Sequence, residues 1–200
     1  LQSDIDGLAA TLGDWAAWDD TYQFIADRNA AYVENNLDPV ALGNLRVDFL
    51  VFLDREGEQV MSAGCYADRT DIAEAPQSAL DLIGETPQLR AHAAMDGKAS
   101  GIAILPEGPV ILASQPIIKS NRTGPIRGAL IMGRWLGDAE IRRLAKQIEL
   151  PLQLCPIASL AVPPDALEAI DEEAAASDEP LVRILNDEHI GGYGIVRDIA

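Results

Sequence analysis

Six side chains between positions 66 and 134 have the chemistry to hold a small molecule by hydrogen bonds or charge. An arginine guanidinium grips a carboxylate or a phosphate through two parallel hydrogen bonds, and tyrosine, histidine and serine add single donors or acceptors. Gathered around one cavity, these residue types favour recognition of a small polar or anionic ligand. The six candidate ligand-binding residues are Tyr66, Arg69, Arg90, His92, Ser114 and Arg134.

Catalytic patterns are missing from the sequence. His92 and His189 are its two histidines, and neither stands beside a serine–glycine elbow or in a zinc-binding His-Glu-x-x-His pattern. The acid pair Asp68 and Asp71 lacks the alternating oxygen ligands and the glycine of a calcium loop. We therefore predict no catalytic residue, no metal and no cofactor. A hydrolase of unrecognised type that depends on His92 is the alternative enzyme hypothesis.

A run of aromatic and acidic residues near the start of the chain also carries polar chemistry. Trp15, Trp18, Asp19 and Tyr22 are spaced i, i+3, i+4 and i+7, which places three rings and a carboxylate on one face of a predicted helix. A carboxylate that faces a core needs a hydrogen-bond donor, a cation or a bound molecule. We interpret this run, which begins at Asp14, as a structural anchor between the helix and the rest of the domain.

The elements that must position these residues are a long helix and an antiparallel sheet. Apolar residues at three- and four-residue steps predict an amphipathic helix over residues 3–33 that breaks near residues 28–29, with a loop at Asp38-Pro39. Turn-rich, short connectors between the strands that follow imply antiparallel neighbours. The predicted strands are residues 46–53, 60–63, 99–105, 110–118 and 126–136.

Helical and acidic segments complete the predicted organisation as one domain over residues 1–200. Its parts are a helical N-terminal region (1–37), a core (46–155), an acidic insertion (156–180) and a final hairpin (181–200). Within the core, two short helices are expected over residues 76–95, the second after Thr86-Pro87, and another helix follows Asp138 until Pro151.

The order of elements predicts an α+β fold in which the long helix packs on one face of the sheet. The irregular segment of residues 66–95, here called the roof, is expected to cover the other face and to enclose a ligand pocket. Arg134 lies inside an apolar strand and needs an acidic partner, for which Asp19 and Asp48 are the candidates.

Composition excludes one large class of partner. The chain carries 32 acidic and 15 basic residues, a formal charge of -17, so it repels the phosphate backbone of nucleic acids. No run of 18 or more apolar residues occurs. Because the chain begins at Leu1 without a start methionine, it is expected to be a piece excised from between flanking membrane spans.

Two local features leave alternatives open. Cys65 and Cys155 are interpreted as buried free thiols, and a disulfide is possible only if the fold brings their backbones together. Residues 121–123 (NRT) satisfy the acceptor pattern for N-linked glycosylation, but asparagine is expected in a turn in any case.

The chain resembles the fourth class of CHASE domain, an extracellular sensory module of histidine kinases and nucleotide cyclases that is grouped with the Cache sensors. Together the matching segments span about residues 8–150, and the acidic insertion has no counterpart in the family pattern. These segments are residues 14–20 (DWAAWDD), 32–37 (YVENNL), 48–54 (DFLVFLD) with Gly57, 114–117 (SQPI) and 128–136 (GALIMGRWL).

The resemblance implies a PAS/Cache-like fold and a ligand-sensing domain in the extracytoplasmic (periplasmic) part of an inner-membrane signalling protein. That protein would be a histidine kinase or a diguanylate cyclase or phosphodiesterase, with its enzyme activity in a cytoplasmic domain. The ligand would be a small molecule, and the first helix would carry the signal toward the membrane. A stripe of Leu8, Leu12 and Trp15 on this helix predicts a homodimer. The alternative is a free periplasmic small-molecule binding or scaffold protein.

Overall fold

The computed structural model describes residues 1–65, 72–155, 162, 181–186, 189–193 and 198–199. The chain divides into two compact units, Leu1–Glu140 with Asp198–Ala200, and Ile141–Arg197. The predictions for Tyr66, Arg69 and the acidic insertion lie outside the described residues. The single domain over residues 1–200 stays a prediction.

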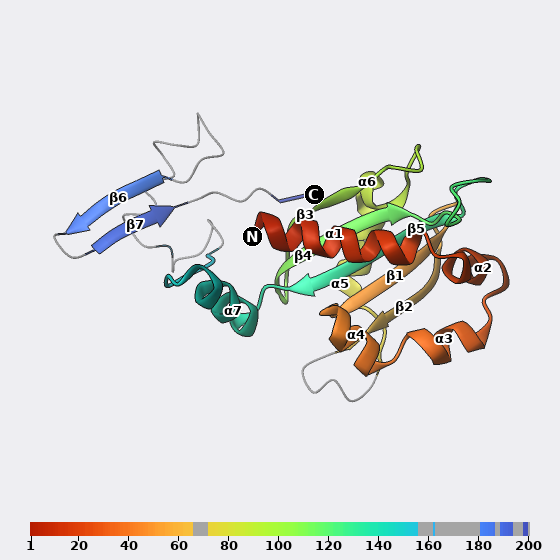
Figure 1. The fold of residues 1–200 in the computed structure, drawn as a ribbon, viewed down its shortest axis with the longest axis horizontal. Helices are drawn as coiled ribbons and strands as arrows, with labels where there is room; N and C mark the ends of the chain where they lie inside the picture. Colours follow the sequence, from red (N-terminus) through yellow and green to blue (C-terminus); the bar gives the residue numbers. More distant parts are fainter. Residues whose placement is uncertain (66–71, 156–161, 163–180, 187–188, 194–197, 200) are drawn as a thin grey trace. The chain divides into compact units, whose positions relative to one another are not determined.

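A five-stranded antiparallel sheet forms the centre of the first unit, with strand order β2-β1-β5-β4-β3 (Figure 1). The sequence pattern located every one of these strands to within three residues at either end. Central strand β5 is buried over seven of its eight residues, so both faces of the sheet must be covered. The strands are β1 (Phe49–Asp54), β2 (Gln59–Gly64), β3 (Ala99–Leu105), β4 (Gly108–Pro116) and β5 (Gly128–Trp135).

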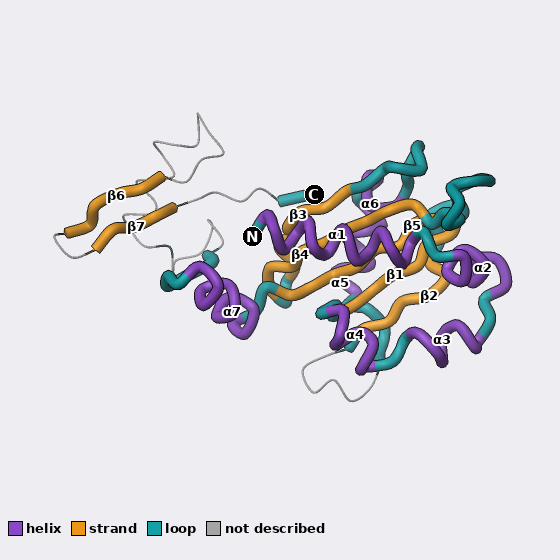
Figure 2. Tube along the Cα trace, viewed as in Figure 1, coloured by secondary structure: helices purple, strands orange, loops and turns teal. Residues whose placement is uncertain are grey.

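Helix α1 lies along one face of the sheet, as Figure 2 shows. Leu8 and Leu12 are fully buried there, and the Gln115 side chain of β4 donates to the Ala9 carbonyl at 2.5 Å. The α+β arrangement with an N-terminal helix on the sheet is therefore confirmed. Because the sheet already buries Leu8 and Leu12, Trp15 is the half-buried member of the apolar stripe, and the homodimer stays a prediction. The helices of the first unit are α1 (Gln2–Ala16), α2 (Asp19–Asp27), α3 (Ala30–Asn36), α4 (Pro39–Leu45), α5 (Gln77–Glu85) and α6 (Pro87–Arg90).

The predicted helix over residues 3–33 is wrong in its continuity. The predicted break is present, since Arg28 adopts the left-handed conformation (φ 50°), but a second interruption occurs at Trp18, whose backbone is extended (φ -87°, ψ 134°). The shared face of Trp15, Trp18 and Asp19 is therefore lost, and both Trp18 and Asp19 are exposed.

Helix α4 begins where the sequence analysis expected a loop. The Asp38 side chain accepts a hydrogen bond from the Ala41 N–H at 2.8 Å, and Pro39 occupies the first helical position. An acidic N-cap followed by proline is a helix-start signal that the sequence analysis missed.

Aromatic rings connect α2 and α3 to strand β1. Phe24 stacks on Tyr32 with centroids 4.5 Å apart, Phe52 meets Phe24 edge-on at 5.2 Å, and Trp18 lies 6.3 Å from Tyr32. The Tyr32 hydroxyl shares a hydrogen bond with Thr21 at 2.7 Å, and burial raises the pKa of Tyr32 to about 12. Trp18 thus packs through its ring while its outer surface faces solvent.

Helix α2 holds the connector between β4 and β5, residues 117–127. The Asp19 carboxylate accepts hydrogen bonds from both the N–H and the hydroxyl of Ser120, each at 2.9 Å. The Tyr22 hydroxyl donates to the Pro125 carbonyl, and the Arg127 guanidinium lies 4.0 Å from the centroid of the Tyr22 ring. Asp19 therefore has a hydrogen-bond donor as its partner, although it lies at the surface and not in the core.

The other face of the sheet packs against α5 and α6 of the roof. As predicted, α6 starts directly after Thr86. A core of buried residues forms between these helices and the sheet, and its largest members are Phe49, Val51, Leu53, Ile83, Leu89, Leu105, Val110, Leu112 and Ile131. The described part of the roof therefore covers the face that the sequence analysis assigned to it.

The second unit contains most of α7 (Asp138–Ile148) and the antiparallel pair β6 (Leu181–Asn186) and β7 (His189–Tyr193), which confirms the predicted last hairpin. Cys65 and Cys155 do not form a disulfide. Among the residues that the structure describes, no helix is both long and apolar enough to cross a membrane.

A methyl group at Gly133 is expected to destabilise the sheet. An added Cβ would lie 2.1 Å from the Phe49 ring, so Gly133→Ala should lower the free energy of unfolding by about 3 kcal/mol through overpacking. Urea unfolding measures this difference. Gly84→Ala, at an exposed position of α5, is the control, since its Cβ meets nothing within 4 Å and alanine favours a helix by up to ~1 kcal/mol. Equal urea midpoints for the two variants would contradict the described packing.

The anchor at Asp19 predicts a pH-dependent stability. Hydrogen bonds from the Ser120 N–H and hydroxyl hold the pKa of Asp19 below its ordinary value of 3.8. Because the folded-state pKa is depressed, the stabilisation is complete above pH ~4 and is lost as the pH falls through the folded-state pKa. Asp19→Asn should therefore lower the urea midpoint at neutral pH, and this difference should shrink below pH ~4. Asp20→Asn, with the same charge change in the same helical turn, should lack this pattern.

Candidate functional site

Ser114 and Arg134 point to opposite faces of the sheet. In the β4–β5 register Ser114 lies opposite Ile131, and Ile111 lies opposite Arg134. Since successive side chains on a strand alternate between faces, Ser114 shares the roof face with Ile131, whereas Arg134 faces the side that helices α1 to α4 cover. The sheet therefore separates two of the residues that were predicted to share one pocket.

Ser114 and His92 form a hydrogen-bonded pair beneath α6. Ser114 is fully buried, and its hydroxyl donates to the Leu89 carbonyl at 2.7 Å. His92, which follows α6 and is half-buried, places Nε2 at 2.9 Å from the same Ser114 oxygen. The structure therefore brings these two predicted residues together and fixes both to the end of α6.

The hydrogen count of this pair determines which atom donates. A hydroxyl has one hydrogen, and a carbonyl oxygen can only accept, so the Ser114 hydrogen points to Leu89 and His92 must donate from Nε2. Neutral His92 then carries no hydrogen on Nδ1, which is left as an acceptor near Gly97. A serine nucleophile would instead donate its hydrogen to the imidazole. In this pair the imidazole donates to the serine oxygen, which is the reverse direction.

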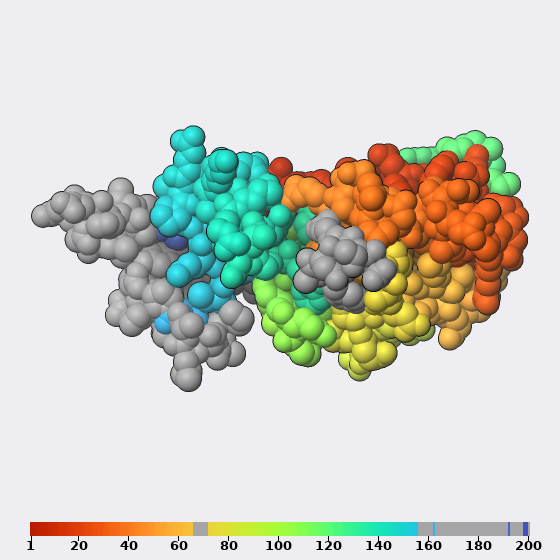
Figure 3. Space-filling view, turned by 90° about the horizontal axis from the view of Figure 1, so that it is seen from below, coloured from red at the N-terminus to blue at the C-terminus, as the bar shows by residue number. Residues whose placement is uncertain are grey.

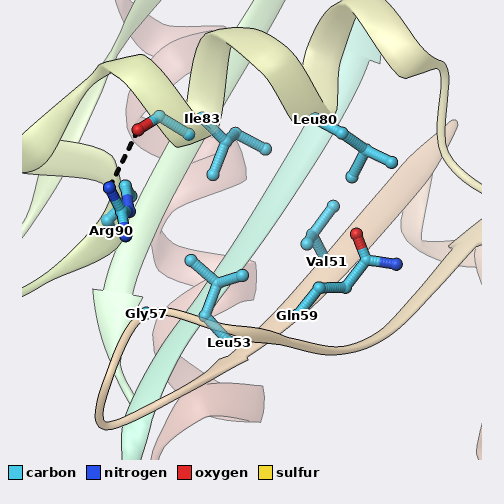
Figure 4. Close-up of a pocket in the computed structure, with 8 residues that line it drawn as sticks. Val51, Leu53, Gly57, Gln59, Leu80, Ile83 and Arg90 are labelled. Carbon is cyan, nitrogen blue, oxygen red and sulfur yellow. Dashed lines mark hydrogen bonds between the residues drawn. The ribbon is translucent and has the colours of Figure 1, made fainter.

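Arg90 lies at one end of a small pocket between α5 and the β1–β2 hairpin (Figure 4). Its Nη1 donates to the Gly84 carbonyl at 3.0 Å, while Nη2 and Nε lie beside Gly57. Gly57 has φ 81°, and an added Cβ would lie 3.1 Å from Nη2, so glycine suits both the turn and the close approach. The pocket is lined by Val51, Leu53, Gly57, Gln59, Leu80, Ile83, Gly84 and Arg90.

The size and lining of this pocket limit what it can hold. Its volume of about 90 Å³ is below the ~300 Å³ at which pockets for drug-sized ligands begin. A water molecule occupies ~30 Å³ in the liquid, so the pocket has room for a few heavy atoms. Arg90 and Gln59 are polar and lie on opposite sides of the pocket, and the remainder includes the apolar side chains of Val51, Leu53 and Ile83 (Figure 4). It fits a carboxylate-sized group with a short apolar part.

Arg134 binds the end of helix α4. It is 7% exposed, its Nε donates to the Arg46 carbonyl at 2.6 Å, and its Nη2 approaches the Leu45 carbonyl at 3.5 Å. A cation at the last carbonyls of a helix is favourable, because these groups carry partial negative charge. The suggestion that Asp19 is its acidic partner is wrong, since that carboxylate binds Ser120.

Asp48, the second candidate partner of Arg134, accepts a hydrogen bond from the Trp135 N–H at 2.8 Å. Gly57 and Gln59 line the pocket but were not among the predicted site residues, although a glycine that ends a β-turn was a usable signal for the former. No group of three or more histidine, cysteine or acidic residues suited to a metal ion occurs in the described part of the chain. The ligand-binding roles of Arg90, His92 and Ser114 stay predictions.

Comparison with known proteins places the chain in a family. The model of the CHASE4 domain matches residues 1–155. The methanogenesis regulatory histidine kinase FilI of Methanothrix harundinacea (strain 6Ac) is 33% identical over 154 residues, which is 77% of this chain. The chain spans only 17% of the length of that kinase.

A solved structure is also similar to part of the chain. The E. coli DcuS sensor domain matches with a TM-score of 0.42 and 16% sequence identity, over 72% of this chain and 96% of the solved one. The family match covers the aromatic–acid run and the sheet, the segments that carry the resemblance in the sequence. This chain belongs to the CHASE4 domain family, whose members are sensing domains of signalling proteins.

Proposed function

We propose that this chain is the extracytoplasmic, ligand-sensing domain of a membrane-bound histidine kinase, and that its ligand binds on the roof face of the sheet. The observation that carries the proposal is the position of α6. This short helix supplies the Leu89 carbonyl to Ser114, ends at Arg90 of the pocket, and leads directly into His92. The four-residue helix α6 thus connects the hydrogen-bonded pair of Ser114 and His92 to Arg90 of the pocket.

The similarity to a histidine kinase supports the kinase over the cyclase and over the free binding protein. The kinase activity itself would reside outside this chain, which corresponds to a small part of that relative. A ligand that prefers one position of α6 over another shifts the population between the two positions. The domain would then pass on its signal through a movement and not through a chemical reaction.

The chemistry of the site favours a small ligand with an anionic group. Arg90 is half-buried and uses Nη1 on Gly84, so its other nitrogens are the donors nearest to Gly57 at the pocket. A carboxylate would accept a charge-assisted hydrogen bond there and place a short apolar part against Leu53 and Ile83.

Thermal unfolding of the purified domain against a panel of organic acids, amino acids, polyamines, nucleotides and metal ions tests the proposal. A ligand at ~100 times its Kd that binds only the folded form adds about 2.7 kcal/mol to the free energy of unfolding. We expect a small carboxylate to raise Tm. Arg90→Gln should abolish this increase, because it removes the cation at the pocket.

Arg55→Gln is the matched control, since Arg55 lies in the turn of the β1–β2 hairpin that borders the pocket but is exposed beside Glu56. It should retain the full ligand-induced increase in Tm. An equal increase in the Arg90 and Arg55 variants would place the ligand elsewhere. The absence of a shift with any compound of the panel would overturn the proposed small-molecule sensing.

The environment of His92 predicts a second pH dependence. Burial lowers the pKa of His92 below its ordinary value of 6.5. Between the folded and unfolded pKa values the unfolded chain binds more protons, so stability should fall as the pH is lowered from ~7 and level off below the folded pKa. His92→Gln, which keeps a hydrogen-bond donor for Ser114, should remove this contribution. Urea unfolding across this pH range measures it, and identical pH profiles for parent and variant would contradict the buried neutral imidazole.

A further inference from the structure

The β4–β5 connector contains an acceptor sequence for N-linked glycans. Residues 121–123 (NRT) are the one Asn-x-Ser/Thr sequence in the whole chain. Such an acceptor is used only if the asparagine side chain reaches the surface, in a protein exported from the cytoplasm. The proposed extracytoplasmic location meets the second condition, so the inference rests on the proposed function. The structure allows the first condition to be examined.

The tip of the connector is accessible to a large enzyme. All residues from 120 to 125 are exposed. The connector projects beyond the beginning of β5 near α2, and it forms part of the molecular outline in the space-filling view (Figures 1 and 3). A sugar chain at this tip would therefore extend into solvent without displacing a packed element.

The contacts of the connector also keep its tip presented in the folded protein. Ser120 is held by the Asp19 carboxylate on one side of the tip, and the Arg127 guanidinium donates to the Tyr22 carbonyl at 2.8 Å on the other. The Ile118 N–H donates to the Ala16 carbonyl at 3.0 Å, which fixes the start of the connector. Residues 121–124 extend between these two attachments.

The two functional side chains of the acceptor sequence are already in contact. The Thr123 hydroxyl donates to Asn121 Oδ1 at 2.7 Å, and the Thr123 N–H donates to the same oxygen at 3.0 Å. Two donors on the carboxamide oxygen withdraw electron density from the amide, which makes the Nδ2 hydrogens more acidic. In the described part of the chain, Nδ2 itself has no hydrogen-bond partner, so the atom that must react remains available.

We propose that Asn121 is an N-glycosylation site and that the donor is an oligosaccharide linked to a polyprenyl phosphate or diphosphate. In the transfer, Asn121 Nδ2 forms a bond to the anomeric carbon of the sugar. The bond between that carbon and the phosphate oxygen breaks, and the lipid phosphate leaves with the electron pair. Nδ2 loses one proton, which neutralises the departing phosphate, so no oxidant or reductant is required.

Mass spectrometry of the full-length protein, isolated from the membranes of its own cells, tests the site. The peptide that contains Asn121 should be heavier by the mass of a glycan. This increase should be lost in Asn121→Gln and in Thr123→Val, and it should be kept in Thr123→Ser, which retains the hydroxyl. An unmodified Asn121 in the parent protein, or a glycan that persists in both Asn121→Gln and Thr123→Val, would overturn the inference.

A second measurement separates failure of the site from failure of the location. Arg122→Cys keeps the acceptor pattern and places a thiol at the exposed tip, where a membrane-impermeant maleimide should label it in intact cells above the level of the parent. Labelling together with an unmodified Asn121 overturns the glycosylation alone. Absence of labelling in intact cells, with labelling after lysis, overturns the extracytoplasmic location and the glycosylation together.

Discussion

The burial of strand β5 on both sides is the constraint on which the rest of the structure depends. Every residue from Gly128 to Arg134 is buried, so two separate layers must cover the sheet. Apolar side chains meet this demand directly, but a buried polar group needs a hydrogen-bond partner in the layer above it. Ser114 donates to the Leu89 carbonyl in the roof, and Arg134 donates to the Arg46 carbonyl after α4. Each covering layer is thus joined to the sheet by a polar side chain that reaches a main-chain carbonyl.

Sequence patterns predicted where the helices and strands lie in the chain better than they predicted the directions in which side chains point. The strands, the helix start after Thr86 and the final hairpin each follow from local signals, which are present in the residues themselves. The faces of Ser114 and Arg134 instead depend on the register between β4 and β5, which periodicity does not determine. The prediction that the aromatic–acid run shares one helical face was wrong for a similar reason. The extended backbone at Trp18 ends the helical periodicity, so the residues after it point in other directions than one continuous helix would give them.

The sequence predicted which residue types form the candidate site, but not how their side chains are placed relative to one another. Arg90, His92 and Ser114 were selected for their chemistry, but the pairing of His92 with Ser114 arises because α6 places the residues after it above β4. The roof is irregular, so no periodic pattern specifies which of its side chains point inward. The pocket beside Arg90 depends on the φ of Gly57 and on the end of α5 at Glu85, two features that lie 28 residues apart in the sequence.

The two layers differ in how readily a ligand can move them, and this difference favours the roof as the mobile part. Helix α1 has fully buried side chains along its length, and displacing one such leucine costs ~2 kcal/mol or more. Helix α6 has four residues, too few for a stable helix in isolation, and it buries one leucine, Leu89, worth ~2 kcal/mol, and accepts one hydrogen bond from Ser114 of the sheet, worth about 1 kcal/mol. The Gln88 side chain of α6 also donates to the Ile199 carbonyl at 2.6 Å, and the Ile199 N–H donates to Ile102 of edge strand β3. A charge-assisted hydrogen bond from a ligand, ~1.5–3 kcal/mol, is therefore comparable to what holds α6, the helix that is joined to residues 198–199 through Gln88.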